Sequence, residues 1–444
     1  MNITDFSAAR ITAAVRSGTV TATQVVRAFS DRIKATADLN NFITLCESDA
    51  LKRAEQIDKS VNGGNASGKL LGVPIAIKDN IGTAGVRTTC ASRLLENNVP
   101  EVDAEVVKRL TKAGAIVIGK TNMDEFAFGS TNEYSAYGAA RNALDVDRVT
   151  GGSSGGSASA VAARQAPLAL GTDTGGSVRQ PAAFCGVVGL KPTFGAIDRR
   201  GVIGLCPSLE QVGIFARDAD DVLSLFSVLA ERAEQDLDGS VSGKTIGIAK
   251  EFLQISPSDG VLKQFNRAVD TLKALGVNVV DVSVPSFAAG LSAYHVLSSA
   301  EATKSFGEIA SDFPQTEKLG AEVKRRLIIG AAVVDGDNYD GLYIKAARVR
   351  RAITDDYNNA LKACDMLLCP TTATVAAKIG GVTDPQKNHL CDSYLAPVSL
   401  AGLPAVSVPF GKSENLPVGV QIIGGYNAER QILNLGKALM CADK

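Results

Sequence analysis

The chain has 444 residues, 45% of them hydrophobic, and a formal net charge of −1. This length and composition support a large buried core in one or two domains. A near-neutral net charge does not indicate the positively charged surface that binds nucleic acid or an anionic membrane. We therefore expect any RNA to be contacted mainly through another subunit. The sequence shows no transmembrane run and no secretory signal, which indicates a soluble intracellular protein.

Cysteine and histidine usage argues against a metal centre. The eight cysteines are scattered, mostly in apolar context, and indicate buried reduced thiols rather than a disulfide framework. Cys364 and Cys369 lack the second Cys/His pair that a zinc site needs. His295 and His389 are the only histidines. We therefore expect no metal in this chain.

The first third of the chain predicts helices followed by alternating helices and strands. Apolar residues recur at helical spacing in 8–15, 25–33 and 47–57, which predicts a helical lead-in over about 1–60. The apolar run 70–77 predicts a buried strand that ends at Lys78. A helix over 104–113 and a strand over 115–119 then alternate as in an α/β protein. The long polar loop 120–142 is a candidate lining for a site.

The same alternation is predicted in the second half of the chain. Predicted helices cover 219–230 and about 262–275, and predicted strands cover 245–249, 277–284, 366–370, 403–409 and 418–423. Residues from about 290 to 360 predict a charged, mainly helical segment that interrupts the alternation of helices and strands, here called the helical excursion. Residues 384–392 predict a polar loop. Because no repeat or composition shift divides the chain, we predict a single domain over 1–444.

The most distinctive stretch, 148–193, holds two Gly-Gly-Ser corners. The first surrounds Ser153 and Ser154 in GGSSGGS, and the second precedes Ser177 in TDTGGS. Glycines at this density let main-chain N–H groups approach a ligand, as an oxyanion site beside a serine nucleophile requires. A flexible linker is the alternative interpretation, but the Ala/Val-rich and apolar segments that follow favour packed structure.

A serine nucleophile needs a base, and lysine is the obvious choice in a chain with so little histidine. Its ordinary pKa of about 10.4 must be lowered by desolvation before it can accept a proton at neutral pH. Lys78 suits this role because it ends a predicted buried strand. The alternative is a surface lysine at a strand end, and the adjacent Asp79 favours the charged form.

Lys78, the GGSSGGS motif and the segment GTDTGGSVRQPAAFCGVVGLKPT, with the spacing between them, resemble the amidase signature family. The resemblance implies an α/β/α fold with a mixed central sheet covered by helices. It also implies a Ser-cisSer-Lys triad in which Ser177 is the acylated nucleophile, Ser153 the bridging serine and Lys78 the neutral base. Asp173 and Arg179 would support the nucleophile loop. The oxyanion hole would consist of the backbone N–H groups of Thr174, Gly175, Gly176 and Ser177.

Several further segments, including KTNMDEFAFGSTNE, LGAEVKRRLIIG and LLCPTTAT, resemble those members of the family that serve as glutaminase subunits of tRNA-dependent amidotransferases. Such a subunit needs no cofactor of its own and passes ammonia to a B subunit, which uses ATP and Mg²⁺ on tRNA-bound glutamate. A small C-type subunit, or an organellar equivalent, completes the complex. The resemblance implies that Arg350 binds the α-carboxylate of glutamine and Asp392 its α-amino group.

The chain departs from this pattern after Ala302, where an expected aromatic Tyr-Asp-Gly loop is missing. The departure is compatible with an organellar variant, so we expect either the mitochondrial matrix or the bacterial cytoplasm. Three alternatives stay open: a free-standing amidase of small or aryl amides, a catalytically idle assembly subunit, and an α/β-hydrolase. The last is suggested by the match of 151–155 to G-x-S-x-G, with His389 as its late histidine.

Overall fold

The computed structural model describes residues 2–382 and 391–443. The strands that form its main sheet are β1 (Phe42–Leu45), β2 (Pro74–Lys78), β3 (Ile116–Thr121), β6 (Leu168–Thr172), β7 (Val188–Lys191), β8 (Val212–Ala216), β9 (Thr245–Ala249), β10 (Asn278–Val282), β11 (Met366–Pro370), β12 (Ala405–Ser413) and β13 (Leu416–Gly424). Two further strands, β4 (Arg141–Asn142) and β5 (Asp145–Val149), pair with each other.

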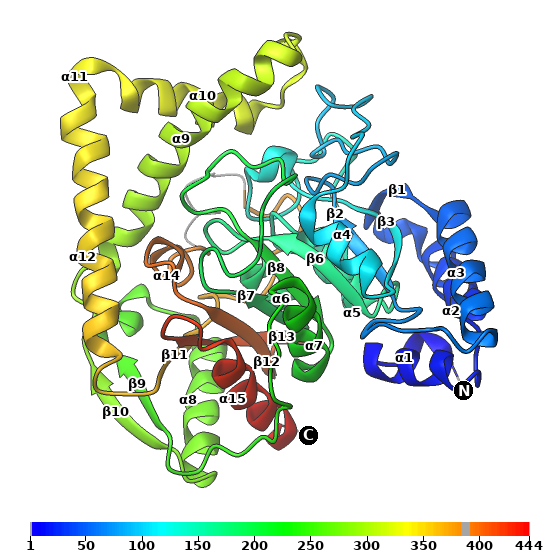
Figure 1. The fold of residues 1–444 in the computed structure, drawn as a ribbon. Helices are drawn as coiled ribbons and strands as arrows, with labels where there is room; N and C mark the ends of the chain where they lie inside the picture. Colours follow the sequence, from blue (N-terminus) through cyan, green and yellow to red (C-terminus); the bar gives the residue numbers. More distant parts are fainter. Residues whose placement is uncertain (1, 383–390, 444) are drawn as a thin grey trace.

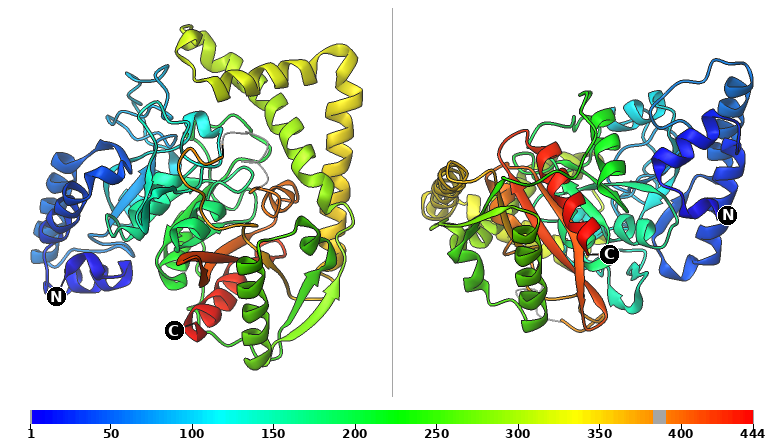
Figure 2. Two further views of the ribbon diagram at one scale, coloured as in Figure 1. Left: turned by 180° about the vertical axis from the view of Figure 1, so that it is seen from behind. Right: turned by 90° about the horizontal axis from the view of Figure 1, so that it is seen from below.

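The α-helices lie around this sheet or in an arm that extends away from it (Figures 1 and 2). They are α1 (Ala8–Arg16), α2 (Ala22–Ala35), α3 (Glu47–Asn62), α4 (Glu105–Lys112), α5 (Gly155–Ala162), α6 (Arg179–Cys185), α7 (Ala219–Leu229), α8 (Asp259–Ala274), α9 (Gly290–Asp312), α10 (Ala321–Val334), α11 (Gly336–Tyr339), α12 (Lys345–Ala360), α14 (Ala396–Leu400) and α15 (Glu429–Ala442). None of the helices in the described ranges is long and apolar enough to cross a membrane.

Within the described residues the main sheet has eleven strands in the order β1-β3-β2-β6-β8-β7-β12-β13-β11-β9-β10. The pairing is mixed, because β2 runs parallel to β3 and β6, whereas β8 is antiparallel to both β6 and β7. Every residue of β2, β6 and β8 is buried, as expected for central strands covered by helices on both faces. The predicted α/β class with a mixed, helix-covered sheet is confirmed.

Several strands were not predicted from the sequence, among them β1 and β8. β1 lies inside the predicted helical lead-in, where it pairs antiparallel with β3 at the edge of the sheet. Its four residues are partly exposed. A segment this short cannot show a clear alternation of apolar and polar residues. β8 was not predicted, although it supplies a central, fully buried strand. By contrast, the predicted bounds of β9 and β11 agree with the structure.

The predicted helical excursion forms an arm that extends away from the sheet (Figure 1). α9 and α10 pack against each other, α11 and the π-helix η7 (Asp340–Ile344) form the corner, and α12 returns to the body. The segment after Ala302, where the chain departs from its family pattern, begins in α9 and continues through the 3-10 helix η6 (Thr316–Lys318) to the start of α10. The arm begins beside the nucleophile loop, because Tyr294 of α9 packs against that loop.

The sheet topology determines where catalytic groups can gather. β2 and β6 are parallel neighbours, so their carboxyl ends, Lys78 and Thr172, meet at one edge of the sheet. The amino end of β8 reaches the same edge, because Thr172 pairs with Val212 in the antiparallel ladder. Crevices at the carboxyl ends of strands are the usual ligand sites of open α/β sheets. Polar residues of this edge are therefore candidates for the site.

Candidate active site

Lys78 and Ser153 are in direct contact inside the protein. Neither residue is exposed, and the Nζ atom of Lys78 lies 2.7 Å from the Oγ atom of Ser153. Nζ also lies 2.9 Å from the Oγ1 atom of Thr172. An amine that meets two hydroxyls in a buried space is placed to exchange protons with them.

The loop after β3 shapes the backbone around Ser153. The peptide bond between Gly152 and Ser153 is cis. The N–H of Asp124 donates to the Ser153 carbonyl at 3.2 Å, and the Asp124 carboxylate accepts N–H groups from Asn132 and Tyr134 at 2.9 and 3.1 Å. A Cβ on Gly152 would lie 2.1 Å from a carboxylate oxygen of Asp124, so only glycine fits there. The polar loop predicted to line a site thus holds the serine corner in place.

The environment of Lys78 favours a neutral amine. Complete burial lowers its pKa from 10.5 to about 8, and the negative charges of Glu210, Asp124 and Asp173 oppose this shift. Desolvation therefore outweighs the surrounding carboxylates. A lysine with a pKa near 8 is partly unprotonated at neutral pH, and its free amine can accept a proton from a hydroxyl.

Ser177 lies beside this pair on the loop between β6 and α6. It is partly exposed, and its carbonyl accepts the N–H of Ser154 at 3.2 Å. The structure therefore shows the predicted contact of Lys78 with Ser153 and joins the backbone of Ser177 to the residue that follows Ser153. Ser177 is the member of the three that a ligand can reach from solvent, as a nucleophile must be.

A buried ion pair holds the nucleophile loop. The Arg179 guanidinium binds both oxygens of Asp173, at 3.0 and 2.9 Å, and also donates to Gln421 and Ser399. Burial alone would raise the pKa of the Asp173 carboxyl, but Arg179 keeps that pKa below its ordinary value. The Asp173 carboxylate also accepts the N–H of Gly176 at 2.9 Å. The supporting role predicted for Asp173 and Arg179 matches these contacts.

Three of the four predicted oxyanion donors are available in this conformation. Among the described residues, the N–H groups of Thr174, Gly175 and Ser177 donate to no protein acceptor. The N–H of Gly176 is already used by Asp173. Gly176 has a φ of +137°, and a Cβ there would collide with Leu395, so its glycine is required by the turn.

Tyr294 of α9 covers the loop on the side of Gly175. A Cβ on Gly175 would lie 2.4 Å from the Cζ atom of the Tyr294 ring. The ring thus lies against the backbone that precedes Ser177. The sequence alone did not point to Tyr294, because its apolar neighbours on α9 predict only a packed helix.

The two predicted substrate-binding residues have different surroundings. Asp392 is buried, accepts the Ser130 hydroxyl at 2.7 Å, and has a pKa raised to about 7 by burial. Arg350 donates from Nε to the Leu400 carbonyl and from its two terminal nitrogens to Ser208, at 2.8–3.0 Å. Its guanidinium therefore fastens two neighbouring segments. Among the described contacts, none joins Arg350 to Asp392.

A different arginine, Arg326 of α10, acts on Asp392. Its positive charge lowers the pKa of the Asp392 carboxyl, against the larger effect of burial. Arg326 is buried, is paired with Glu322 at 2.9 Å, and lies 2.9 Å from the Nδ1 atom of His295. Arg326 belongs to the EVKRR segment, which is among the segments that resemble the family. Spacing alone gave no means of choosing between the arginines of this region.

The chain is similar to proteins of one known family. Residues 24–433 match the model of the family described as Amidase. In Caldanaerobacter subterraneus subsp. tengcongensis, the A subunit of glutamyl-tRNA(Gln) amidotransferase is 41% identical over 458 residues, which cover 96% of this chain and 94% of the relative.

Solved structures give the same picture. The crystal structure of the A subunit of glutamyl-tRNA(Gln) amidotransferase from Thermotoga maritima has a TM-score of 0.83 and 37% identity, and the match covers 99% of this chain and 95% of that one. A crystal structure described as an amidase has a TM-score of 0.91 and 32% identity, with 99% and 100% covered. These similarities extend over nearly the whole length of every chain compared.

Proposed function

The chain belongs to the amidase family, and we propose that it works as the glutaminase subunit of a glutamyl-tRNA(Gln) amidotransferase. It is an enzyme that acts on the carbon–nitrogen bonds of amides. The observation that carries the proposal is the buried contact of Lys78 with Ser153, beside Ser177, in a chain similar over its whole length to such subunits.

In the proposed reaction, Ser177 attacks the side-chain amide of glutamine. Its proton passes to Ser153 and then to the neutral amine of Lys78, which lies 2.7 Å from Ser153. Lys78 returns the proton through Ser153 to the departing nitrogen, which leaves as ammonia. Water then attacks the ester on Ser177 by the same proton path and releases glutamate.

The charge that develops on the amide oxygen would be stabilised by the backbone N–H groups at Thr174, Gly175 and Ser177. Each such donor is typically worth about 3 kcal/mol in the transition state. For the N–H of Gly176 to take part, it would have to leave the Asp173 carboxylate, to which it donates at 2.9 Å. The first three donors therefore need no rearrangement of the loop.

Recognition of glutamine would require an anionic group for its ammonium and a cation for its carboxylate. Asp392 is buried and its carboxylate suits the ammonium. For the carboxylate, Arg350 is the residue implied by family resemblance, whereas Arg326 is the arginine whose charge acts on Asp392. We favour Arg326 because its charge acts on Asp392. Both arginines also have protein contacts, Arg326 with Glu322 and Arg350 with Ser208.

The proposed function includes partner subunits. We infer a heteromeric complex in which a B subunit receives the ammonia and uses ATP and Mg²⁺ to amidate glutamate on tRNA(Gln), with a small C-type or organellar subunit. The chain itself is proposed to need no cofactor, and its net charge of −1 is in keeping with tRNA contact mainly through the partner. Its place would be the bacterial cytoplasm or the mitochondrial matrix, and the relatives named above are bacterial.

A free-standing amidase of small or aryl amides is the second candidate, since a structure described only as an amidase has a TM-score of 0.91. An idle assembly subunit is disfavoured by the intact contact between Lys78 and Ser153. The α/β-hydrolase interpretation is wrong, because the family model matches residues 24–433. The late histidine it required, His389, lies outside the described residues.

The deciding experiment measures ammonia release from glutamine by the purified chain, alone and after co-expression with B and C subunits. Ser177→Ala provides the blank. Partner-dependent release that disappears in the blank supports the glutaminase subunit. No release from glutamine in either setting, together with turnover of simple amides by the chain alone, supports the free-standing amidase instead.

A further inference from the structure

Thr172 is a buried residue at the end of β6, and the proposed mechanism does not use it. The residue is only 1% exposed. Its Oγ1 atom lies 2.9 Å from the Nζ atom of Lys78, and its carbonyl oxygen lies 3.4 Å from the same Nζ atom. The Oγ atom of Ser153, at 2.7 Å, is the other contact of Nζ. Among the described residues, Nζ is hydrogen-bonded only to Ser153 and Thr172.

Both Thr172 oxygens are suited to accept the N–H groups of Lys78. A carbonyl oxygen has no proton to donate. The Oγ1 atom has two lone pairs, and one of them accepts the Nδ2 group of Asn80 at 3.2 Å, which leaves the other for Lys78. Nδ2 of Asn80 also donates to the Ile203 carbonyl at 3.2 Å. Because a carbonyl pairs only with a donor, this contact sets the nitrogen end of the Asn80 amide toward Thr172.

The surrounding structure holds the two Thr172 oxygens in place. Thr172 pairs with Val212 in the antiparallel ladder of β6 and β8. The hydroxyl of Ser154 donates to the Thr172 carbonyl at 3.1 Å. Because threonine is branched at Cβ, its χ1 angle is restricted, and the buried Asn80 amide holds the hydroxyl in the observed position. Both acceptors therefore have fixed directions.

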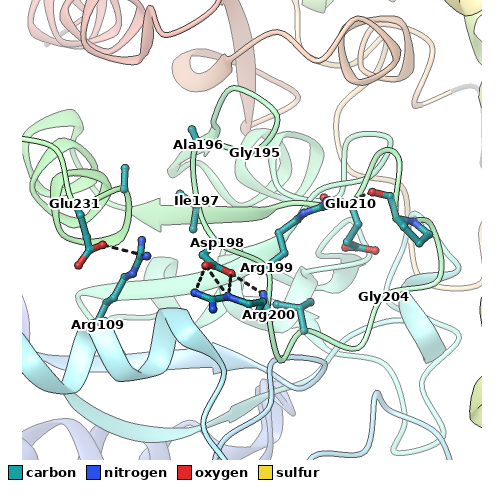
Figure 3. Close-up of a pocket in the computed structure, with 13 residues that line it drawn as sticks. Arg109, Gly195, Ala196, Ile197, Asp198, Arg199, Arg200, Gly204, Glu210 and Glu231 are labelled. Carbon is teal, nitrogen blue, oxygen red and sulfur yellow. Dashed lines mark hydrogen bonds and ion pairs between the residues drawn. The ribbon is translucent and has the colours of Figure 1, made fainter.

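Among the described residues, no carboxylate is hydrogen-bonded to Nζ. The titratable groups that oppose the effect of burial on the pKa of Lys78 come from four segments around this edge of the sheet, namely Glu210, Asp124, Asp173 and Cys90. Glu210 lines a cavity of about 700 Å³ together with Arg199 and Gly204 (Figure 3). A carboxylate bound directly to Nζ would hold the ammonium proton more strongly than an uncharged oxygen does. The Thr172 oxygens therefore orient the amine and still allow it to be neutral.

The hydrogen-bonding groups of the amine match its three contacts in both protonation states. A neutral amine has two N–H groups and one lone pair. With both N–H groups on Thr172, the lone pair faces the Ser153 hydroxyl, whose proton it has to accept. The ammonium has three N–H groups, which the two Thr172 oxygens and the Ser153 oxygen accept. The contacts with Thr172 thus stay the same during proton transfer, and only the contact with Ser153 reverses its direction.

We propose that Thr172 is a positioning residue that binds both N–H groups of the neutral Lys78 amine and thereby directs its lone pair at the Ser153 hydroxyl. Asn80 supports this arrangement by holding the Thr172 hydroxyl. The Ser153 proton moves to Nζ when Ser177 attacks the amide, and the same proton returns to Ser153 when the departing nitrogen is protonated. The proposal rests on the proposed function in one respect, the role of Lys78 as base, and it applies to any amide substrate.

The test removes one acceptor and keeps the shape of the side chain. Thr172→Val replaces the hydroxyl with a methyl group. Above the Lys78 pKa of about 8, where the amine is neutral, kcat is expected to fall by about 10-fold or more with KM unchanged, because the ammonium formed in the reaction loses a hydrogen bond. The low-pH limb of kcat/KM is expected to move down by about one pH unit, because the same loss makes the ammonium less stable.

Two further variants serve as controls. Thr172→Ser keeps the hydroxyl and is expected to restore most of the kcat and the wild-type position of the limb. Thr121→Val is the matched control, because Thr121 is buried and pairs with Lys78 in the β2–β3 register, whereas its hydroxyl is hydrogen-bonded to Ser157 at 2.6 Å. This control is expected to lose stability as Thr172→Val does and to leave the limb where it is.

A wild-type kcat in Thr172→Val would overturn the proposal. A lower kcat with an unmoved limb would overturn it as well, since a purely structural defect gives that result. If Thr172→Val does not fold, the double variant Asn80→Ala/Thr172→Val carries the test, because it removes the buried donor together with its acceptor. The expected and the contradicting results are then the same.

All variants are assayed on glutamine and on a simple amide, with the partner subunits where turnover needs them. Turnover of the simple amide alone by the wild-type chain refutes the proposed substrate and leaves the test of Thr172 intact. A wild-type profile without a low-pH limb near pH 8 refutes Lys78 as the base and, with it, the role of Thr172.

Discussion

The Nζ atom of Lys78 lies 2.7 Å from the Oγ atom of Ser153, and neither side chain has access to solvent. Bulk solvent therefore reaches neither the amine of Lys78 nor the hydroxyl of Ser153. Burial of Lys78 beside Ser153 also lowers the pKa of the Lys78 amine. One physical cause, burial, therefore accounts both for the contact and for the basicity of the amine. Substitutions at this contact and at its supports should therefore change activity and stability in defined ways.

The first prediction concerns pH. Because the pKa of Lys78 is lowered to about 8, kcat/KM is expected to rise with pH as the amine loses its proton around that value. The folded state binds this proton less tightly than the unfolded chain, whose lysine has a pKa of 10.5. The contribution of Lys78 to the free energy of unfolding should therefore increase with pH between about 8 and 10.5.

A pH–rate profile and urea unfolding at several pH values check both expectations. Lys78→Ala is expected to abolish turnover and to remove this part of the pH-dependent stability, whereas Lys69→Ala, at an exposed lysine, should change neither. A wild-type profile that is flat through pH 8 would contradict the assignment of Lys78 as base.

The second prediction concerns the contact of Gly175 with Tyr294. Gly175→Ala places a methyl group 2.4 Å from the ring, so either the ring or the nucleophile loop has to move. We expect a loss of about 1–3 kcal/mol of stability, as for other overpacked sites, together with a lower kcat. Tyr294→Ala in the same chain should restore much of the kcat.

The control for this pair is Gly307→Ala in α9, where no atom lies within 4 Å of the added Cβ. Alanine there is expected to stabilise the helix by about 0.5–1 kcal/mol. A double variant as inactive as Gly175→Ala would mean that the methyl group acts directly on the loop rather than through Tyr294.

The third prediction concerns the buried pair of Asp173 and Arg179. Arg179→Met leaves the Asp173 carboxylate buried without its partner, which typically costs about 3–5 kcal/mol. Chemical denaturation should show this loss. Arg351→Met breaks the exposed pair with Asp355 and is expected to cost less than about 1 kcal/mol. Equal effects of the two substitutions would argue that the buried pair does not support the nucleophile loop.

The fourth prediction distinguishes the two candidate carboxylate-binding arginines. Arg326→Gln is expected to raise KM for glutamine by about 10-fold or more, since a charge-assisted contact is worth about 1.5–3 kcal/mol. The kcat for a small uncharged amide should change little. Arg350→Gln is expected to act on stability, because it loses the contacts to Ser208 and Leu400. The reverse pattern in the KM values would favour Arg350 as the substrate residue.

Much of the fold and the contact of Lys78 with Ser153 could be predicted from the sequence. Short apolar runs between turn signals predicted β9 and β11 with their observed bounds. Such runs are recognisable because strands covered on both faces consist almost entirely of apolar residues. The serine corners were found because GGSSGGS and TDTGGS are long, uncommon motifs. Lys78 was found because it follows a buried strand and has the spacing of a known family.

The remaining parts of the site depend on contacts that no local pattern records. The pairing of Thr172 with Val212 depends on the antiparallel register of β6 and β8, and β8 itself was not predicted. Asp124 meets Gly152 because a loop folds back against the serine corner. Arg326 and Asp392 are far apart in the sequence and come near each other only when the arm packs on the body.

The most direct test of the central claim is to stop the reaction during turnover of glutamine and locate the acyl group by peptide mass spectrometry. The mechanism predicts a glutamyl ester on Ser177, and predicts that Ser177→Ala shows neither the ester nor ammonia release. An ester on Ser153 instead, or full ammonia release by Ser177→Ala, would contradict the assignment of Ser177 as the nucleophile.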